Sequence, residues 1–276
     1  MATTAFGASL AMIVGSAYTT PALVHYLVGE SQVETMKSMT PWVRVQGRPP
    51  VNLLGDEGTW CVLLGASLLA MSFTYLITWH AKMPVAQARA TGLARLVIAA
   101  GLVFMHLHLG FPKLVALIAG NDILTGLLTI LMPTYSFTIL PNMVMTWALG
   151  LGLMTPELRP KVAEGFAMLA VKMDEEPVQL NVEFLFHVFL ATLCGHAVMP
   201  LVGAMLMNAR CLRASGKVGL MVAGVFAVAA GLEHIDQELA IFFGAAHAIY
   251  GFLVLVIVPK EVDVKKPTPG RKQKTI

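Results

Sequence analysis

The chain is a series of long, continuous apolar runs separated by short polar stretches. Several runs approach or exceed the roughly 20 residues that an α-helix needs to cross the hydrocarbon core of a bilayer. They are apolar throughout and do not alternate with polar positions, so they predict helices rather than the strands of a membrane barrel. We expect spans at residues 5–28, 59–79, 96–120, 123–154, 184–207, 218–232 and 239–258.

Composition supports this interpretation. The sequence is 57% hydrophobic and only 13% charged, whereas ordinary soluble domains carry roughly 25% charged residues. We therefore predict an all-α integral membrane protein, a bundle of six to seven transmembrane helices, with residues 1–258 forming one polytopic membrane domain. Residues 259–276 are basic and rich in proline, which predicts a disordered cytoplasmic tail. Three scattered cysteines give neither a disulfide framework nor a zinc signature.

Two segments do not fit a simple span. Residues 123–154 are long for one span and short for two, and Pro133 and Pro141 interrupt them. They are either a single span or a proline-broken, re-entrant hairpin, a feature that membranes tolerate where protein buries the backbone. Residues 156–177 are amphipathic at helical spacing. They predict a helix lying in the membrane interface or a helix packed on the bundle.

Charge in the short loops predicts topology, because basic loops stay cytoplasmic. By this rule residues 82–95, 210–217 and the tail lie inside, both termini are cytoplasmic, and the acidic stretches 174–176 and 233–238 lie outside. Asn121 and Asp122 then also lie outside, so residues 123–154 would begin and end on one side, which favours the hairpin. The net charge of +3 comes largely from the tail and predicts no nucleic-acid partner. Lys272 and Lys274 match a dilysine pattern, so the endoplasmic reticulum or another organelle membrane is one predicted location.

The candidate chemistry lies in histidines at predicted membrane depth. The stretch VFMHLHLGFPK, residues 103–113, places His108 at the centre of span 96–120, with His106 just before it, and His196 and His247 fall near the middles of their own spans. An ionisable group at this depth is costly and indicates function by default. Such residues could relay protons, bind a metal ion or ligate a haem. Without an HxxxH or HExxH motif, simple hydrogen bonding across helix interfaces stays an open alternative.

A second group of candidates lies toward the predicted outer surface. Lys113 shares a helix face with His106, and Glu183 and His187 share one stripe of span 184–207. A Lys113–Glu183 ion pair could gate a pathway. The alternative is that Lys113 snorkels to the interface while Glu183 faces water.

Four functions follow from these patterns. The leading hypothesis is transport or conduction of protons or a small cation through a His-lined bundle, using His106, His108, Lys113, Glu183, His187, His196 and His247. The alternatives are a non-catalytic accessory subunit of a larger membrane complex, a haem- or metal-binding membrane oxidoreductase subunit, and a membrane enzyme of the endoplasmic reticulum that acts on a lipid-like substrate. The expected partners are the lipid bilayer and either other membrane subunits or further copies of this chain.

Overall fold

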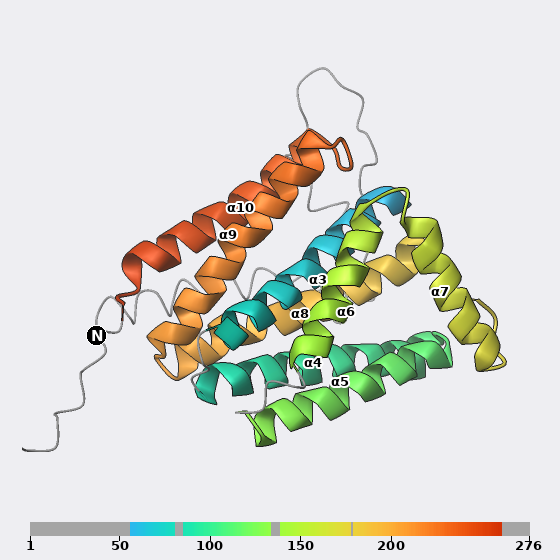
Figure 1. Cartoon of the computed structure of the whole chain (residues 1–276), viewed down its shortest axis with the longest axis horizontal. Helices are drawn as coiled ribbons and strands as arrows, with labels where there is room; N and C mark the ends of the chain where they lie inside the picture. Colours follow the sequence, from blue (N-terminus) through green and yellow to red (C-terminus); the bar gives the residue numbers. More distant parts are fainter. Residues whose placement is uncertain (1–55, 81–84, 134–138, 178, 261–276) are drawn as a thin grey trace, which may run out of the picture.

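The computed structural model describes residues 56–80, 85–133, 139–177 and 179–260, and all secondary structure in these ranges is helical. The predicted span 5–28 and most of the predicted tail lie outside the described residues. Figure 1 shows the helices, whose bounds are α3 (Glu57–His80), α4 (Val85–Leu109), α5 (Lys113–Leu131), α6 (Ile139–Met154), α7 (Arg159–Lys172), α8 (Val182–Met205), α9 (Ala209–Gly231) and α10 (Gln237–Ile257).

Six of these helices, α3, α4, α5, α8, α9 and α10, are long and apolar enough to cross a membrane, and α6 is apolar but shorter. Helix α7 is the amphipathic segment, and it packs against α6 at one end of the bundle. The all-α membrane bundle predicted from the sequence is thereby confirmed.

Glycine pairs hold the antiparallel helices together. In each of the pairs α3–α6, α4–α5 and α9–α10, a glycine backbone lies directly against another glycine backbone. A Cβ atom on Gly126 would lie 2.9 Å from the carbonyl oxygen of Gly92, and one on Gly251 would lie 2.6 Å from that of Gly216. Small residues allow close approach of membrane helices, where lipid-facing apolar surface gains little from burial.

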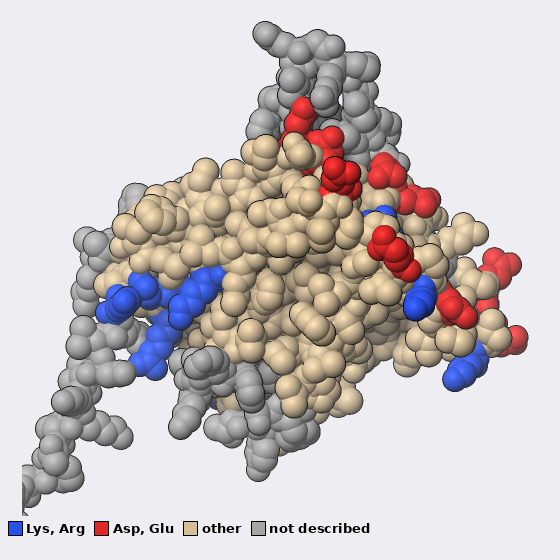
Figure 2. Space-filling view, turned by 45° about the horizontal axis from the view of Figure 1, so that its top comes forward, with Lys and Arg blue, Asp and Glu red and all other residues tan. Residues whose placement is uncertain are grey.

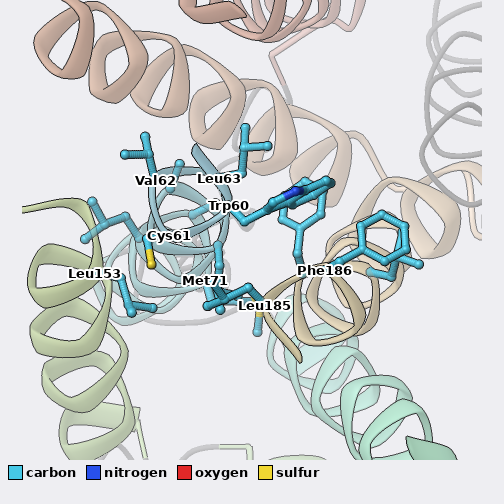
Figure 3. Packing of buried hydrophobic residues seen from close by; sticks show 14 of the residues in the cluster. Trp60, Cys61, Val62, Leu63, Met71, Leu153, Leu185 and Phe186 are labelled. Atoms are coloured by element: carbon cyan, nitrogen blue, oxygen red, sulfur yellow. The ribbon is translucent and has the colours of Figure 1, made fainter. Parts of the chain in front are cut away.

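The core lies around α3 and α8, which run parallel through the bundle. Figure 3 shows Trp60 reaching from α3 toward Phe186 on α8. Their ring centroids are 4.8 Å apart in an edge-to-face arrangement, and Phe189 makes a similar contact with Trp60 at 5.7 Å. Trp60 and Phe186 are both fully buried, so this aromatic contact fixes the two helices against one another.

The two ends of the bundle differ in charge, as Figure 2 shows. At the end where α3 and α8 begin, called here the acidic end, lie all described acidic residues except one. At the opposite end, the basic end, lie Arg89, Arg210, Arg213, Lys217 and Lys260, and none of the described Asp or Glu residues. The exception is Asp122, which lies in the middle of α5.

The most important departure from the predicted helices is at residues 96–120. The segment is not one helix but the end of α4, a turn and the start of α5. Gly110 has a φ of +71°, the amide N–H of Phe111 donates to the carbonyl oxygen of Met105, and Pro112 caps α5. A left-handed glycine followed by proline is a common way to end a helix. Here the turn reverses the chain, so that α4 and α5 form a helical hairpin.

Two further boundaries change as a consequence. Residues 123–131 continue α5, because Asp122 is inside the helix and does not end it, and the second half of the segment 123–154 is α6. The segment thus forms two helices, which rules out the single-span alternative. The first arm of the expected hairpin is not a re-entrant half-helix, however, but the end of α5, which is long enough to cross the membrane. The predicted span 218–232 is also too short, because α9 begins at Ala209 and contains the basic residues assigned to a loop. One of them, Arg213, donates to the carbonyl oxygens of Leu255 and Val258 at the end of α10.

We expect alanine at Gly110 to lower the free energy of unfolding by about 1 kcal/mol, the cost of a left-handed conformation for a residue with a Cβ. No atom lies within 4 Å of a Cβ built there, so the effect is one of backbone conformation alone. The matched control is Gly120→Ala, an equally open position inside α5, which should stabilise the helix by about 0.5–1 kcal/mol. Thermal unfolding in detergent measures both changes, and equal effects of the same sign would contradict this description of the turn.

Candidate functional site

The first polar cluster in the bundle joins α3, α4 and α5 and consists of Tyr75, Arg95, Asp122 and Thr125. Arg95 is 3% exposed. Its Nε donates to the Tyr75 hydroxyl, and its Nη1 donates to the Asp122 carboxylate and, at 3.1 Å, to the Thr125 hydroxyl. The guanidinium carbon also lies 5.0 Å from the Tyr75 ring centroid. This group is called the Arg95 cluster below.

The Arg95 cluster carries both of its charges in the interior of helices that span the membrane. Arg95 and Asp122 are the only oppositely charged side chains that meet in the interior of the described part of the bundle. Either charge alone would be costly at that depth, and their pairing allows both helices to continue through the membrane. The cluster was not predicted from the sequence, because the charge pattern places Arg95 in a basic loop and Asp122 in an outer turn.

The second polar cluster joins α3 to α8 and consists of Ser67, Thr192 and His196. The imidazole Nε2–H of His196 donates a hydrogen bond to the carbonyl oxygen of Ser67, at 2.7 Å. The Ser67 hydroxyl donates to the Thr192 hydroxyl at 2.7 Å, and that of Thr192 donates to the carbonyl oxygen of Phe189. In the neutral ring, this arrangement leaves Nδ1 of His196 as the basic nitrogen.

His247 lies midway along α10, facing α9. Its ring stacks on Phe226, with the centroids 6.3 Å apart and the ring planes 18° apart. One turn further along α10, the hydroxyls of Tyr250 and Ser215 form a buried hydrogen bond of 2.7 Å. His196 and His247 are thus the two predicted site histidines that the structure places near the middle of their helices.

The other two histidines lie elsewhere. His106 and His108 are in the last turn of α4, at the acidic end. Nδ1 of His106 donates to the carbonyl oxygen of Phe111 in the turn, at 2.7 Å, and His108 is exposed beside Phe104. The prediction that they lie at the membrane centre is wrong. The predicted span 96–120 is centred at His108, but α4 begins at Val85 and ends at Leu109, so His108 lies at the end of a helix.

The predicted outer pair also changes. Lys113 lies 3.4 Å from Glu175, in the turn after α7, and not beside Glu183. Glu183 is exposed in the first turn of α8, and its backbone carbonyl accepts a hydrogen bond from Nδ1 of His187 at 2.7 Å. The side chain of Lys113 is 65% exposed and that of Glu175 is 15% exposed, so this ion pair lies at the edge of the bundle and not in its interior.

Among the described residues, no group of three or more His, Cys, Asp or Glu could hold a metal ion. Haem ligation stays a prediction of the sequence. Nε2 of His196 is already used by the Ser67 carbonyl, so a ligand bond from this residue in its present orientation would come from Nδ1.

The fold and these buried clusters define the class of protein. The chain is a multi-pass integral membrane protein, an α-helical bundle with a buried ion pair and with two half-buried histidines midway along their helices. Comparison of the chain with protein-family models, with curated protein sequences and with solved structures finds no match. The function is therefore inferred from the side chains inside the bundle.

Proposed function

We propose that this protein transports or conducts protons or a small cation across its membrane. The observation that carries the proposal is the pair of mid-depth histidines, His196 on α8 and His247 on α10, in a bundle that also contains a buried carboxylate. Imidazole is the side chain that exchanges protons most readily near neutral pH, and ionisable residues inside membrane bundles mark ion and proton pathways. The pathway proposed here is shorter than the sequence suggested, because His106, His108, Lys113 and Glu183 lie at one end.

The unequal ends of the bundle support an orientation. Among the described residues, the basic end carries five Arg or Lys residues and no Asp or Glu, whereas the acidic end carries nearly all of the carboxylates together with Lys113 and the three basic residues of α7. Because the positive-inside rule applies to short loops, we propose that the basic end faces the cytoplasm. The carboxylates of the acidic end would then attract cations to the opposite mouth of the bundle.

The test uses glutamine at each histidine. His196→Gln retains an N–H donor for the Ser67 carbonyl but cannot take up a proton, and His247→Gln is its counterpart on α10. In liposomes containing the full-length chain, we expect both variants to lose proton or cation flux and to keep the thermal stability of the wild type. His234→Gln, in the turn between α9 and α10, is the control that should keep wild-type flux. Undiminished flux in both the His196→Gln and the His247→Gln variant would refute the role of these histidines.

A further inference from the structure

The three helices α3–α5 and the three helices α8–α10 bury equivalent positions. Adding 125 to the buried positions of α5 gives five of the six buried positions of α10, as in the pairs Leu114 and Leu239, or Gly126 and Gly251. Five of the six buried residues of α5 have a buried counterpart in this way. The sixth is Asp122, and its counterpart is His247, which is half-buried.

The same register holds for the second helices. A separation of 124 residues matches ten of the eleven buried residues of α4 with buried residues of α9. The sequences correspond too, because residues 89–99 read RATGLARLVIA and residues 213–223 read RASGKVGLMVA. Gly92 and Gly216, the glycines against which the third helices pack, occupy the same place in this alignment.

The first helices agree in their caps and in their contact. Asp56 accepts a hydrogen bond from the backbone N–H of Thr59 at the start of α3, and Asn181, 125 residues later, accepts one from Phe184 at the start of α8. Ser67 and Thr192 are also 125 residues apart, and they are hydrogen-bonded to each other.

Contacts between the two halves have the reciprocity of a two-fold interface. The equivalent helices α3 and α8 meet each other through equivalent residues, α4 packs on α8, and α9 packs on α3. In a two-fold arrangement, each contact between the first copy and the second is accompanied by the reverse contact. Since α3 and α8 run parallel, the axis lies along the bundle, beside the Ser67–Thr192 contact.

We propose that the chain consists of two copies of one three-helix unit, related by an approximate two-fold axis along the membrane normal, and that Asp122 and His247 are the equivalent ion-binding positions of the two copies. The assignment of these two residues rests on the proposed transport function. Repeats related by such an axis are common in transporters, and their binding sites lie near the midplane. Asp122 would take the proton or cation in the first copy, as His247 does in the second.

The surroundings of this position differ between the copies in a way that explains the two residue types. Beside Asp122, α4 provides Arg95 as a counter-charge. The counterpart of Arg95 on α9 is Gly219, where an added Cβ would lie 3.0 Å from the carbonyl oxygen of His247. The second copy thus has glycine where the first has its arginine, and it carries a residue that can be neutral. When a proton or cation occupies the carboxylate of Asp122, Arg95 keeps the hydroxyls of Tyr75 and Thr125 as hydrogen-bond partners.

The architecture is tested by a cross-link that depends on the two-fold relation. In the structure, Gly101 on α4 lies against Ala191 on α8, and the equivalent pair in the reverse direction is Val225 and Ala66. In a full-length chain whose three native cysteines are replaced by serine, cysteines at positions 66 and 225 should form a disulfide on mild oxidation, as cysteines at 101 and 191 should. Cysteines at 66 and at the exposed position 228 are the control. Failure of the 66–225 pair to cross-link would overturn the duplication.

The ion-binding assignment is tested by copying the second unit's residues into the first. Arg95→Gly with Asp122→His should fold and retain flux in liposomes, because an ionisable group remains at the position. Arg95→Gly with Asp122→Leu should also fold, since no charge is left unpaired, but its flux should fall to that of protein-free liposomes. Equal flux in the two folded double variants would overturn the assignment. A wild-type protein without flux would overturn the proposed function and this assignment with it, whereas the cross-link would still decide the duplication.

Discussion

Replacing Asp122 with leucine should lower the free energy of unfolding of the bundle by about 3–5 kcal/mol. The substitution leaves the Arg95 guanidinium buried between α3, α4 and α5 without its counter-charge. Tyr75 and Thr125 remain as hydrogen-bond partners, but a neutral side-chain hydrogen bond within a membrane bundle contributes only about 0.6–2 kcal/mol. Thermal or chemical unfolding of the purified protein in lipid–detergent micelles measures the loss.

Removing both charges should restore most of the lost stability. Arg95→Met combined with Asp122→Leu replaces the ion pair by apolar side chains, a change that is often neutral or stabilising in buried sites. Lys113→Gln, which removes the 65%-exposed partner of Glu175, is the control at the edge of the bundle and should cost clearly less stability than Asp122→Leu, because water reaches the Lys113 side chain. If the Asp122→Leu variant were as stable as the Lys113→Gln variant, the buried pair could not be important for holding α4 and α5 together.

Leucine at Gly251 should separate α9 from α10 and destabilise the bundle by about 3 kcal/mol or more, at or above the upper end of the usual cost of overpacking. A Cβ there would lie 2.6 Å from the carbonyl oxygen of Gly216 and 2.9 Å from the backbone nitrogen of Leu220. Because these are backbone atoms, no change of side-chain conformation can relieve the clash, and the helices themselves must move apart.

The duplicated architecture makes the same prediction for Gly126, the counterpart of Gly251, where a Cβ would lie 2.9 Å from the carbonyl oxygen of Gly92. The controls are Gly120→Leu on α5 and Gly224→Leu on α9, since no atom lies within 4 Å of a Cβ at either position. Unfolding measurements should show a large loss for both buried glycines and little change for both controls. A similar stability in all four variants would contradict the close glycine contacts.

The sequence predicted the fold class and the two core helices α3 and α8 well, because a continuous apolar run of about 20 residues has few alternatives to a membrane helix. The expected span 59–79 lies within α3, and the expected span 184–207 overlaps most of α8. These helices have polar residues at both ends and an uninterrupted apolar middle, so that composition alone locates them.

The helical hairpin of α4 and α5 was missed because its turn is as apolar as its helices. The residues LGFPK contain the signal, a glycine followed two residues later by a proline, but hydropathy gives such a turn no contrast with its surroundings. The error moved His106 and His108 from the end of a helix to its centre. It also made Asp122 look like a loop residue.

The buried ion pair could not be inferred from composition, because a charge in an apolar run resembles a boundary until its partner is known. Arg95 and Asp122 become compatible with membrane depth only when the hairpin brings α4 and α5 together. The duplication was hidden for a related reason. Its two copies share the spacing of small and buried residues more than the residues themselves, and that spacing is visible only once burial is known.

The most direct test of the transport function is ion flux through the unmodified full-length protein. The purified chain is reconstituted into liposomes that contain a pH-sensitive dye, a potassium gradient with valinomycin sets the membrane potential, and Na⁺ and K⁺ uptake are followed in parallel samples. We predict flux of protons or of one of these cations well above that of protein-free liposomes, and its loss in the His247→Gln variant. Flux equal to that of protein-free liposomes for protons, Na⁺ and K⁺ alike would contradict the proposed function.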